Sequence, residues 1–520
     1  MDSKKIQFII IGILATFVAL YLGVSAATAQ FETIVWVIGS AVLITCISLG
    51  RKIWLLIPFM GALGISLRIP GQPDSGLLGL LLVLGFSVPL FLMRKLPLRY
   101  AWTELEFWCL IVTLFVVQVY LRNPVGVYLF GGGSVGGKPY IIFAIYLAGG
   151  FYLAGLKVPS SDLKWLLRLS IMGGILNLAI SILGTFVYSI GSITGAAQVS
   201  DDKLGNEGYG KAVDAGATSR IGYLGGFGNN LSLWISAYMS PLRACMRPLW
   251  GVLLLLAISA AMMSGFRNSI MSVGFTILLG IMYRSGFSGV VLSVFGLICG
   301  LALLAAINVI TPLPPNMQRS LTFLPGTWEE RYRRDTKESN EWRFEIWREV
   351  LTSKRWIENK WIGDGLGFKA SELASQLNMK NTSGLGTSGF EDHREAILKN
   401  GDYHSGPVQT IRTIGYIGLI FLLIAQVRLA VQAHRQIQRC RYTEWFPLAL
   451  LIGIPLVWTP FFFVFVFGTF SGAAASLFLG SGMVRLLENN LPLPAYVLRS
   501  RLPYILRTRE MFDSGAVVER

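Results

Sequence analysis

A histidine stands immediately before a long apolar run, in the stretch GDYHSGPVQTIRTIGYIG of residues 401–418. The chain has only three histidines, so the position of His404 is informative. An unperturbed imidazole has a pKa of about 6.5, and a neutral His404 can therefore accept a proton from a hydroxyl at physiological pH. We predict that His404 is a general base, with His393 as the competing candidate. The alternative is a loop histidine that is hydrogen-bonded to backbone.

Two arginines stand near the beginning of other apolar runs, Arg267 in MMSGFRNSIMS and Arg220 in TSRIGYLGGFGNN. A guanidinium keeps its charge, and its planar fork matches phosphate oxygens, so both are candidates for anion binding. The glycines after Arg220 allow a ligand to approach the backbone, and Asn229 and Asn230 offer amides for sugar hydroxyls. Each candidate has an ordinary alternative. Arg267 could reach the lipid headgroups from the end of a span, and the asparagines could cap a helix.

The composition is that of a helical membrane protein. Of the 520 residues, 53% are hydrophobic and 14% are charged, against about 25% charged in soluble domains. The apolar residues fall in continuous runs of about 15 to 25, the length of a membrane-spanning helix, and do not alternate as barrel strands do. The net charge of +16 lies largely in short connections. We therefore expect contact with membrane lipids and no nucleic-acid partner.

We predict an all-α polytopic fold of about 12 to 14 transmembrane helices with one large extracytoplasmic loop. The predicted spans lie near residues 6–23, 34–50, 53–67, 76–93, 105–121, 140–156, 164–190, 227–242, 248–264, 268–284, 287–309, 409–428, 446–467 and 469–485. The first run could be a cleaved signal peptide, but its length and its direct continuation into a second span favour an uncleaved helix.

Basic residues set the orientation of the spans. Lys and Arg are concentrated in alternate short connections and in the tail, which places both termini in the cytoplasm by the positive-inside rule. We divide the chain into N-terminal helices (1–190), an outer loop with further helices (191–309), a large outer loop (310–408), C-terminal helices (409–485) and a basic cytoplasmic tail (486–520). His434 falls in an inner connection, where we expect it to be solvated.

The large outer loop has an amphipathic segment, EWRFEIWREVL, whose spacing places Trp342, Ile346, Trp347 and Val350 on one helical face. We expect a helix on the outer membrane surface, with its tryptophans at the interface. The Gly- and Ser-rich residues 363–390 are expected to be mobile. The loop's arginines include Arg319, Arg331, Arg333, Arg334, Arg343 and Arg348. Contact with lipid phosphates explains each singly, but together they indicate an anionic ligand on the face where positive charge is normally avoided.

Metal chemistry has no signature in the sequence. The five cysteines form no CxxC pair, there is no HExxH, and none of the cysteines lies in the large outer loop. We therefore expect no structural or catalytic zinc, no other cofactor and no disulfide framework in that loop.

Four segments, taken in order, resemble the O-antigen ligase and O-antigen polymerase superfamily. They are ATSRIGYLGGFGNN, MMSGFRNSIMS, EWRFEIWREVLTSKRWIENKWIGDGLGF and GDYHSGPVQTIRTIGYIG, and they cover roughly residues 215–425. Each motif is loose, and the specificity comes from the set. The chain departs from the family pattern in three places: a phenylalanine precedes the arginine in FRN where a small residue is usual, ENKW stands where a proline usually precedes the glycines, and serine follows the histidine where asparagine is commoner. The second departure bears on the register of Arg343.

The resemblance implies a GT-C-like, metal-independent, inverting glycosyltransferase in the bacterial inner membrane. Such enzymes move a glycan from undecaprenyl pyrophosphate to an acceptor hydroxyl at the outer face. By motif, the donor pyrophosphate would be bound by Arg267, Arg343 and Arg220, and His404 would be the base. The acceptor would be lipid A-core in a lipopolysaccharide ligase, a second lipid-linked unit in an exopolysaccharide or O-antigen polymerase, or a protein hydroxyl. Other polysaccharide-export proteins are candidate partners.

A transporter or flippase of lipid-linked glycans is the alternative from a different class. Transporters usually keep ionisable residues at the bilayer midplane. The notable charges of this chain stand at predicted outer span ends and in a long outer loop, which favours surface chemistry.

Overall fold

A computed structural model describes residues 31–66, 73–125, 136–187, 199–200, 220–367, 398, 401 and 403–491. The chain divides into two compact units, one of residues 1–54 and 82–96 and the other of residues 55–81 and 97–520. The predicted span 6–23 and nearly all of the basic tail lie outside the described residues.

Of the predicted spans 34–50 and 53–67, the structure has a long helix for the first but not for the second. The first corresponds to α2 (Phe31–Leu49). In place of the second there are a six-residue 3-10 helix, η1 (Gly50–Leu55), and the short helix α3 (Leu56–Leu63). Gly50 and Gly64 have φ angles of 50° and 55°. Glycine takes this left-handed conformation without steric cost, so the two glycines delimit this short segment. Helix α4 (Ser75–Leu92) follows.

Among its described residues the larger unit is mainly helical, with one antiparallel pair of two-residue strands, β1 (Val199–Ser200) and β2 (Arg220–Ile221). Its helices after α4 are α5 (Glu104–Arg122), α6 (Lys138–Gly155), α7 (Ser160–Phe186), α10 (Gly222–Tyr238), α11 (Pro241–Cys245), α12 (Pro248–Met263), α13 (Arg267–Ile310), α14 (Pro315–Leu321), α15 (Glu330–Thr352), α18 (Gly406–Cys440), α19 (Phe446–Phe465) and α20 (Phe470–Asn490).

Within the described residues, eight helices are long and apolar enough to cross a membrane. The chain is therefore a polytopic helical protein of the membrane type. The count is lower than predicted for particular reasons. The end of α2, η1 and α3 together count as one apolar span, Val42–Leu63, where we predicted parts of two, and α13 joins two more predicted spans. Helices α10 and α12 have only 17 and 16 residues. Helix α6, with a lysine and a proline at its start, is not among the eight.

Helix α13 is one element of 44 residues with a sharp break at Gly286, whose φ is 75° and ψ is −168°. The break falls between the predicted spans 268–284 and 287–309. Glycine makes it possible because this backbone conformation excludes a Cβ atom. The two predicted spans are thus consecutive helical segments with almost no loop between them.

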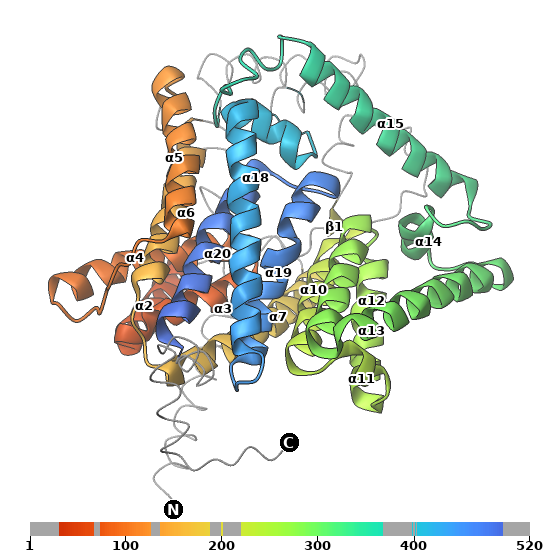
Figure 1. Ribbon diagram of the computed structural model, residues 1–520, viewed down its shortest axis with the longest axis horizontal. Coiled ribbons are helices and arrows are strands. Elements are labelled where there is room, and N and C mark those ends of the chain that lie inside the picture. Colours follow the sequence, from red (N-terminus) through yellow and green to blue (C-terminus); the bar gives the residue numbers. More distant parts are fainter. Residues whose placement is uncertain are drawn as a thin grey trace, which may run out of the picture. The chain divides into compact units, whose positions relative to one another are not determined.

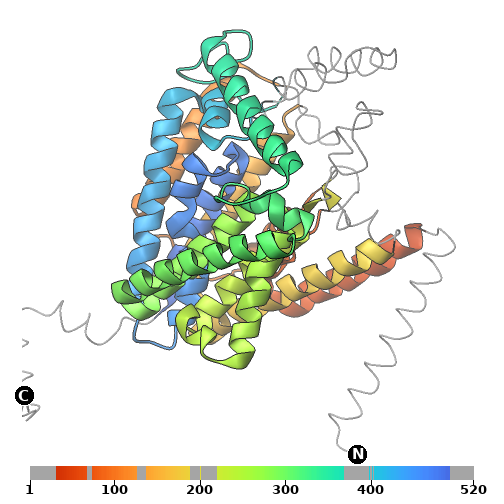
Figure 2. The same cartoon turned by 90° about the vertical axis from the view of Figure 1, so that its right-hand side faces the viewer.

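Helix α18 packs against α5, α19 and α20, while α20 also packs along α6 (Figures 1 and 2). Their shared apolar core includes Val112, Phe143, Leu422 and Phe478. Glycines allow α6 and α20 to approach closely, because a Cβ on Gly482 would lie 2.6 Å from the Gly150 carbonyl oxygen. Small residues at helix contacts are the usual route to tight packing in membranes.

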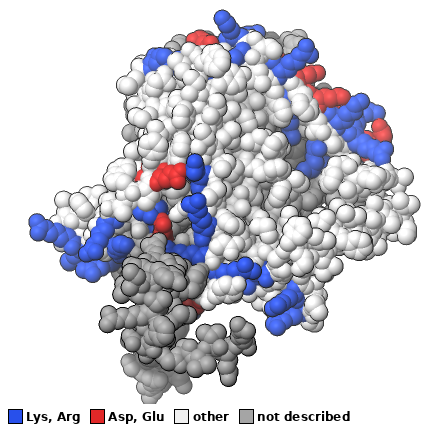
Figure 3. Space-filling view, in the orientation of Figure 1, with Lys and Arg blue, Asp and Glu red and all other residues white. Residues whose placement is uncertain are grey.

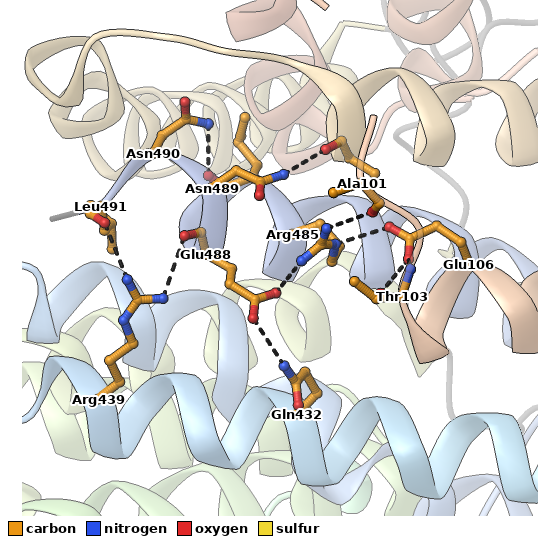
Figure 4. A network of polar contacts seen from close by, with 12 residues as sticks. Ala101, Thr103, Glu106, Gln432, Arg439, Arg485, Glu488, Asn489, Asn490 and Leu491 are labelled. Atoms are coloured by element: carbon orange, nitrogen blue, oxygen red, sulfur yellow. Dashed lines mark hydrogen bonds and ion pairs between the residues drawn. The ribbon is translucent and has the colours of Figure 1, made fainter. Parts of the chain in front are cut away.

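A buried ionic network joins the ends of α5, α18 and α20 that we predict to be cytoplasmic (Figure 4). Arg485 Nε lies 2.9 Å from Glu106 Oε1, and both side chains are less than 10% exposed (5% and 7%). Arg485 also pairs with Glu488 and donates to the Ala101 carbonyl at 2.8 Å. Glu106 additionally accepts from the Thr103 backbone N–H at the start of α5. Every charge in the pair is therefore compensated, which burial requires.

Removing one member of this network should destabilise the fold strongly. We expect Arg485→Met to lower the free energy of unfolding by about 3–5 kcal/mol, because Glu106 stays buried without its partner. The measurement is SDS-driven unfolding of the purified protein in mixed micelles. The control is Lys164→Met, which breaks a 2.9 Å pair with Glu444 whose side chains are 51% and 62% exposed. That variant should lose less than about 1 kcal/mol, and equal losses in the two would contradict the prediction.

Candidate functional site

A loop of residues 359–367 closes over one end of the helix bundle. Arg122 at the end of α5 donates to the Gly363 carbonyl, and Asn123 Nδ2 donates to the Asp364 carbonyl at 3.1 Å. The Leu366 N–H donates to the Tyr140 hydroxyl at 2.9 Å near the start of α6. We call this end of the larger unit, where α5 ends and α6, α18 and α20 begin, the outer end. These are the helix ends for which the basic-residue pattern predicts an extracytoplasmic position.

The same loop fills a break in α18. At Gly415 the φ is 77° and the ψ is 177°, so the helical hydrogen bonds are interrupted. Backbone groups of the loop replace them: Asp364 N–H donates to Arg412 O at 2.6 Å and Gly365 N–H to Thr413 O at 3.1 Å. In return, Tyr416 N–H donates to Lys360 O at 2.8 Å. The break therefore leaves these backbone groups paired, as buried backbone requires.

The Asp364 side chain and three glycines fix the shape of the loop. The Asp364 carboxylate accepts from the backbone N–H groups of Glu358 and Asn359 at 2.8 and 2.9 Å. Gly363, Gly365 and Gly367 have φ angles of 79°, 109° and 81°. Our prediction that residues 363–390 are mobile is therefore wrong for 363–367, because the helix break supplies partners that a linear sequence does not reveal. Residues 368–390 lie outside the described part of the chain.

His404 lies at the turn that leads into α18. Its φ of 51° is in the left-handed region, which is uncommon for any residue other than glycine. The half-buried ring lies between Trp342 of α15 and Phe467 of the α19–α20 connection, with ring centroids 6.0 and 6.4 Å away. Gly406 and Gly468 allow the two turns to approach this closely. The imidazole is thus held between two aromatic rings by a constrained backbone.

Helix α15 presents its apolar face to the protein. The prediction that Trp342, Ile346, Trp347 and Val350 share one face is confirmed, since Ile346 and Val350 are fully buried and both tryptophans pack on the same cluster. The expected lipid surface is not what this face contacts. It covers Tyr403, Val408 and Ile411, and Trp347 Nε1 donates to the Tyr403 carbonyl at 2.7 Å. The pattern predicted the buried face but could not identify its partner.

One turn of α15 connects three of the predicted residues. Arg267, the first residue of α13, donates from Nη2 to Asn340 Oδ1 at 3.5 Å. Trp342 lies beside His404, and Arg343, half-buried, is the next residue. Residues 340–343 therefore lie between Arg267 and His404, and Arg343 is one turn after Asn340.

The other predicted residues lie elsewhere or are not described. Arg220 is in β2, paired in register with Ser200, and its side chain lies outside the description, as does His393. Asn229 accepts a hydrogen bond from Thr276 of α13 at 3.3 Å. The Asn230 amide lies next to Gly174 of α7. Both asparagines are in the interior of α10, which begins earlier than predicted, so their described contacts are between helices.

Arg319, Arg331, Arg333 and Arg334 gather on α14 and α15, and Figure 3 shows basic side chains along this edge of the molecule. Arg331 pairs with Glu329 at 2.7 Å, and Arg333 donates to the Gly326 carbonyl. The exposed end of α15 is thus basic, but some of its charge serves local structure. His434, which we expected to be solvated, is exposed. Its Nδ1 also shares a hydrogen bond of 2.8 Å with the Tyr283 hydroxyl.

Arg412 is a residue that our sequence analysis missed. It lines a cavity of about 300 Å³ at the outer end, formed by α6, α18, α20 and residues 365–367. The signal was present, because an arginine within an apolar run is rarely placed without a function. Arg412 lies within the predicted span 409–428, whose other residues are largely apolar.

Tyr403 lies near both His404 and Arg412, but it does not offer a base. The pKa of the Tyr403 hydroxyl is raised to about 12, chiefly by burial. Nearby Arg412 opposes this rise, and Asp364 adds to it. The hydroxyl therefore remains protonated at neutral pH, and it donates to the Leu398 carbonyl at 3.2 Å.

Among the described residues, no group of three or more His, Cys, Asp and Glu side chains is placed to hold a metal ion. No protein-family model matches the chain, and no curated protein matches its sequence. The resemblance carried by the four motifs therefore stays a prediction.

The loop in the α18 break should be sensitive to a single methyl group. In Gly415→Ala the Cβ would overlap the Trp361 carbonyl, and the residue would also be held at positive φ. We expect a loss of at least about 2 kcal/mol in unfolding free energy and faster protease cleavage in the 359–367 loop. Limited proteolysis with mass spectrometry measures the cleavage. Gly274→Ala is the control, because nothing lies within 4 Å of its Cβ, and it should be neutral or stabilising.

Proposed function

We propose that this chain is a membrane glycosyltransferase that moves a glycan from a polyprenyl pyrophosphate to an acceptor hydroxyl at the outer membrane face. The observation that carries the proposal is the position of residues 340–343 between Arg267 and His404. The three motifs to which these residues belong are far apart in the sequence, yet they meet at one turn of α15. The overall helical membrane architecture is compatible with such an enzyme.

Arg267 and Arg343 supply the positive charge that a pyrophosphate needs. Pyrophosphate is a good leaving group, so the reaction depends more on positioned charge than on a covalent nucleophile. Arg267 begins α13, and its guanidinium is oriented by Asn340. Arg343 is half-buried and stands three residues before Ile346 and seven before Val350, so it lies on the face of α15 that packs against the protein. Arginine forks on rigid elements can bind the two phosphates in fixed positions.

His404 supplies the base. It takes the proton from the acceptor hydroxyl while the hydroxyl oxygen forms a bond to the anomeric carbon of the donor. The bond from that carbon to the pyrophosphate oxygen breaks, and the electron pair leaves with the pyrophosphate. This single displacement inverts the anomeric carbon. The rings of Trp342 and Phe467 lie beside the imidazole and limit the space in which it can turn.

The acceptor distinguishes three forms of the same activity: transfer to lipid A-core, to a second lipid-linked glycan, or to a protein hydroxyl. Transport of the lipid-linked glycan is the competing function. A transporter changes no covalent bond, and the product of a reaction therefore separates it from a transferase. The assay below uses the native host with the gene deleted and replaced by variants, and it follows both mature surface glycan and lipid-linked intermediates on gels.

Arg267→Lys should lose about 10²-fold in transfer rate, with normal insertion in the membrane, because an ammonium is a point charge and not a fork. Lipid-linked donor should accumulate as the product falls. Arg348→Lys is the matched control, since Arg348 is an exposed arginine on α15. A fully active Arg267→Lys variant would remove Arg267 from the donor site.

His404→Asn should lower the rate by about 10²- to 10⁴-fold. Asparagine tolerates the positive φ at this position, so the variant removes the base and keeps the backbone. His404→Ala should be at least as defective, and His434→Ala should be active. If His393→Ala reproduces the defect and His404→Asn does not, the base is His393.

A further inference from the structure

The backbone at His404 has a conformation that the residue would not adopt by itself. Its φ of 51° lies in the left-handed region, where the Cβ atom crowds the following carbonyl oxygen. A non-glycine residue stays in this region only when the surrounding structure fixes it, and such residues are concentrated at functional sites. The contacts that fix this turn therefore bear directly on the candidate base.

The turn is fixed on both sides of His404. Before it, Gln409 Nε2 donates to the Gly401 carbonyl at 3.1 Å. After it, the chain packs so closely on α19 that a Cβ at Gly406 would overlap the ring of Phe463. Neither contact acts on the peptide bond that precedes His404, and the orientation of that peptide bond is what the φ angle describes.

Trp347 of α15 supplies a contact to that peptide bond. Its indole Nε1 donates to the Tyr403 carbonyl oxygen at 2.7 Å. Tyr403 is only 1% exposed, so water does not readily replace this donor. A buried carbonyl that loses its donor is unfavourable, and the peptide bond would rotate to reach another partner. The hydrogen bond from Trp347 therefore holds the orientation that the positive φ of His404 requires.

The indole is itself held by packing. Trp347 is half-buried in the apolar cluster under α15, together with Ile346 and Val350, which are 1% and 0% exposed. Five residues earlier on the same helix, Trp342 lies beside the imidazole, with ring centroids 6.0 Å apart. Helix α15 thus contacts the backbone of the histidine turn through Trp347 and the side chain of His404 through Trp342.

We propose that Trp347 is a positioning residue, whose indole N–H holds the imidazole of His404 in line with the acceptor hydroxyl. Trp347 itself takes part in no bond that forms or breaks. This inference rests on the proposed function, because it concerns the alignment of the base assigned there. Arg267 and Arg343 keep their charge when Trp347 is replaced. The substitution should therefore slow the chemical step without weakening donor binding.

The first test measures transfer rates at a series of donor concentrations. Membranes of the deletion host supply the accumulated lipid-linked donor and the acceptor, and the purified protein is added in nanodiscs. Trp347→Phe keeps an aromatic ring in the cluster but removes the N–H. We expect kcat to fall by about 10²-fold, because a displacement of about 1 Å at a reacting group has this effect. KM for the donor should be unchanged.

Trp356→Phe is the matched control. Trp356 packs on the same apolar cluster, but its Nε1 donates to Glu349 Oε1 at 2.7 Å and not to the histidine turn. This variant should keep the wild-type kcat. If Trp347→Phe does not fold, 3-benzothienylalanine at position 347 makes the same test, because it keeps the bicyclic shape of the indole and has sulfur in place of N–H.

An NMR measurement follows the imidazole without any reaction. The chain has three histidines, so ¹³C-labelled histidine gives a short list of ring signals, and the signal missing from His404→Asn belongs to His404. The rings of Trp342 and Phe467, with centroids 6.0 and 6.4 Å from the imidazole, displace this signal by their ring currents. We expect Trp347→Phe to move the signal and Trp356→Phe to leave it in place.

Two results overturn the proposal. One is a Trp347→Phe variant with the wild-type kcat. The other is a slow variant whose His404 signal is unchanged, because the loss of rate would then not act through the histidine. Failure of the proposed function gives a different pattern. If the wild-type protein transfers no glycan while Trp347→Phe still moves the His404 signal, the indole positions the imidazole and the chain is not a transferase.

Discussion

The break in α18 at Gly415 is the constraint on which the outer end depends. A transmembrane helix normally satisfies its own backbone, and here the loop of residues 359–367 takes over part of that task. Because the loop is fixed by the helix, it can also be fixed to α5 and α6 through Arg122, Asn123 and Tyr140. The same loop forms a wall of the cavity, and the first segment of α18 carries Gln409, Arg412 and Thr413 on another. A single glycine thus determines where the polar groups of two distant segments meet.

The two ends of the larger unit differ in how their charged side chains are paired. At the predicted cytoplasmic end, Arg485, Glu106 and Glu488 compensate one another, and the network joins three helices without an open position for a ligand. At the outer end, arginines lie beside aromatic rings, amides and glycine backbone, around His404 and around the cavity. The first arrangement is a closed ionic network that stabilises the fold, whereas the second places polar and cationic side chains beside a cavity. This asymmetry is what directs the functional proposal to the outer end.

The sequence predicted what depends on local pattern. Apolar runs predicted the membrane class and most helix positions, and the period of Trp342, Ile346, Trp347 and Val350 predicted a buried face. It could not predict what that face would cover, because the partner, the turn of residues 403–411, lies more than fifty residues along the chain. The fixed conformation of residues 363–367 was missed for the same reason. The backbone groups to which this loop is hydrogen-bonded lie at the break in α18, about fifty residues further along the chain. Arg412 was missed because an apolar average over a span conceals one charged residue. The roles of Arg267, Arg343 and His404 were predicted from motifs, and the structure adds their proximity to one turn of α15.

The glycine contact between α6 and α20 has a consequence for how a ligand enters. Gly150 and Gly482 bring the two backbones so close together that a Cβ at either position would meet the backbone of the other helix. The walls that α6 and α20 contribute to the cavity are therefore packed tightly on each other. The remaining walls, the glycine-rich loop and the first turns of α18, are joined by hydrogen bonds. A ligand that enters the cavity is therefore expected to pass on the side of this loop and these first turns, which can open without separating α6 from α20.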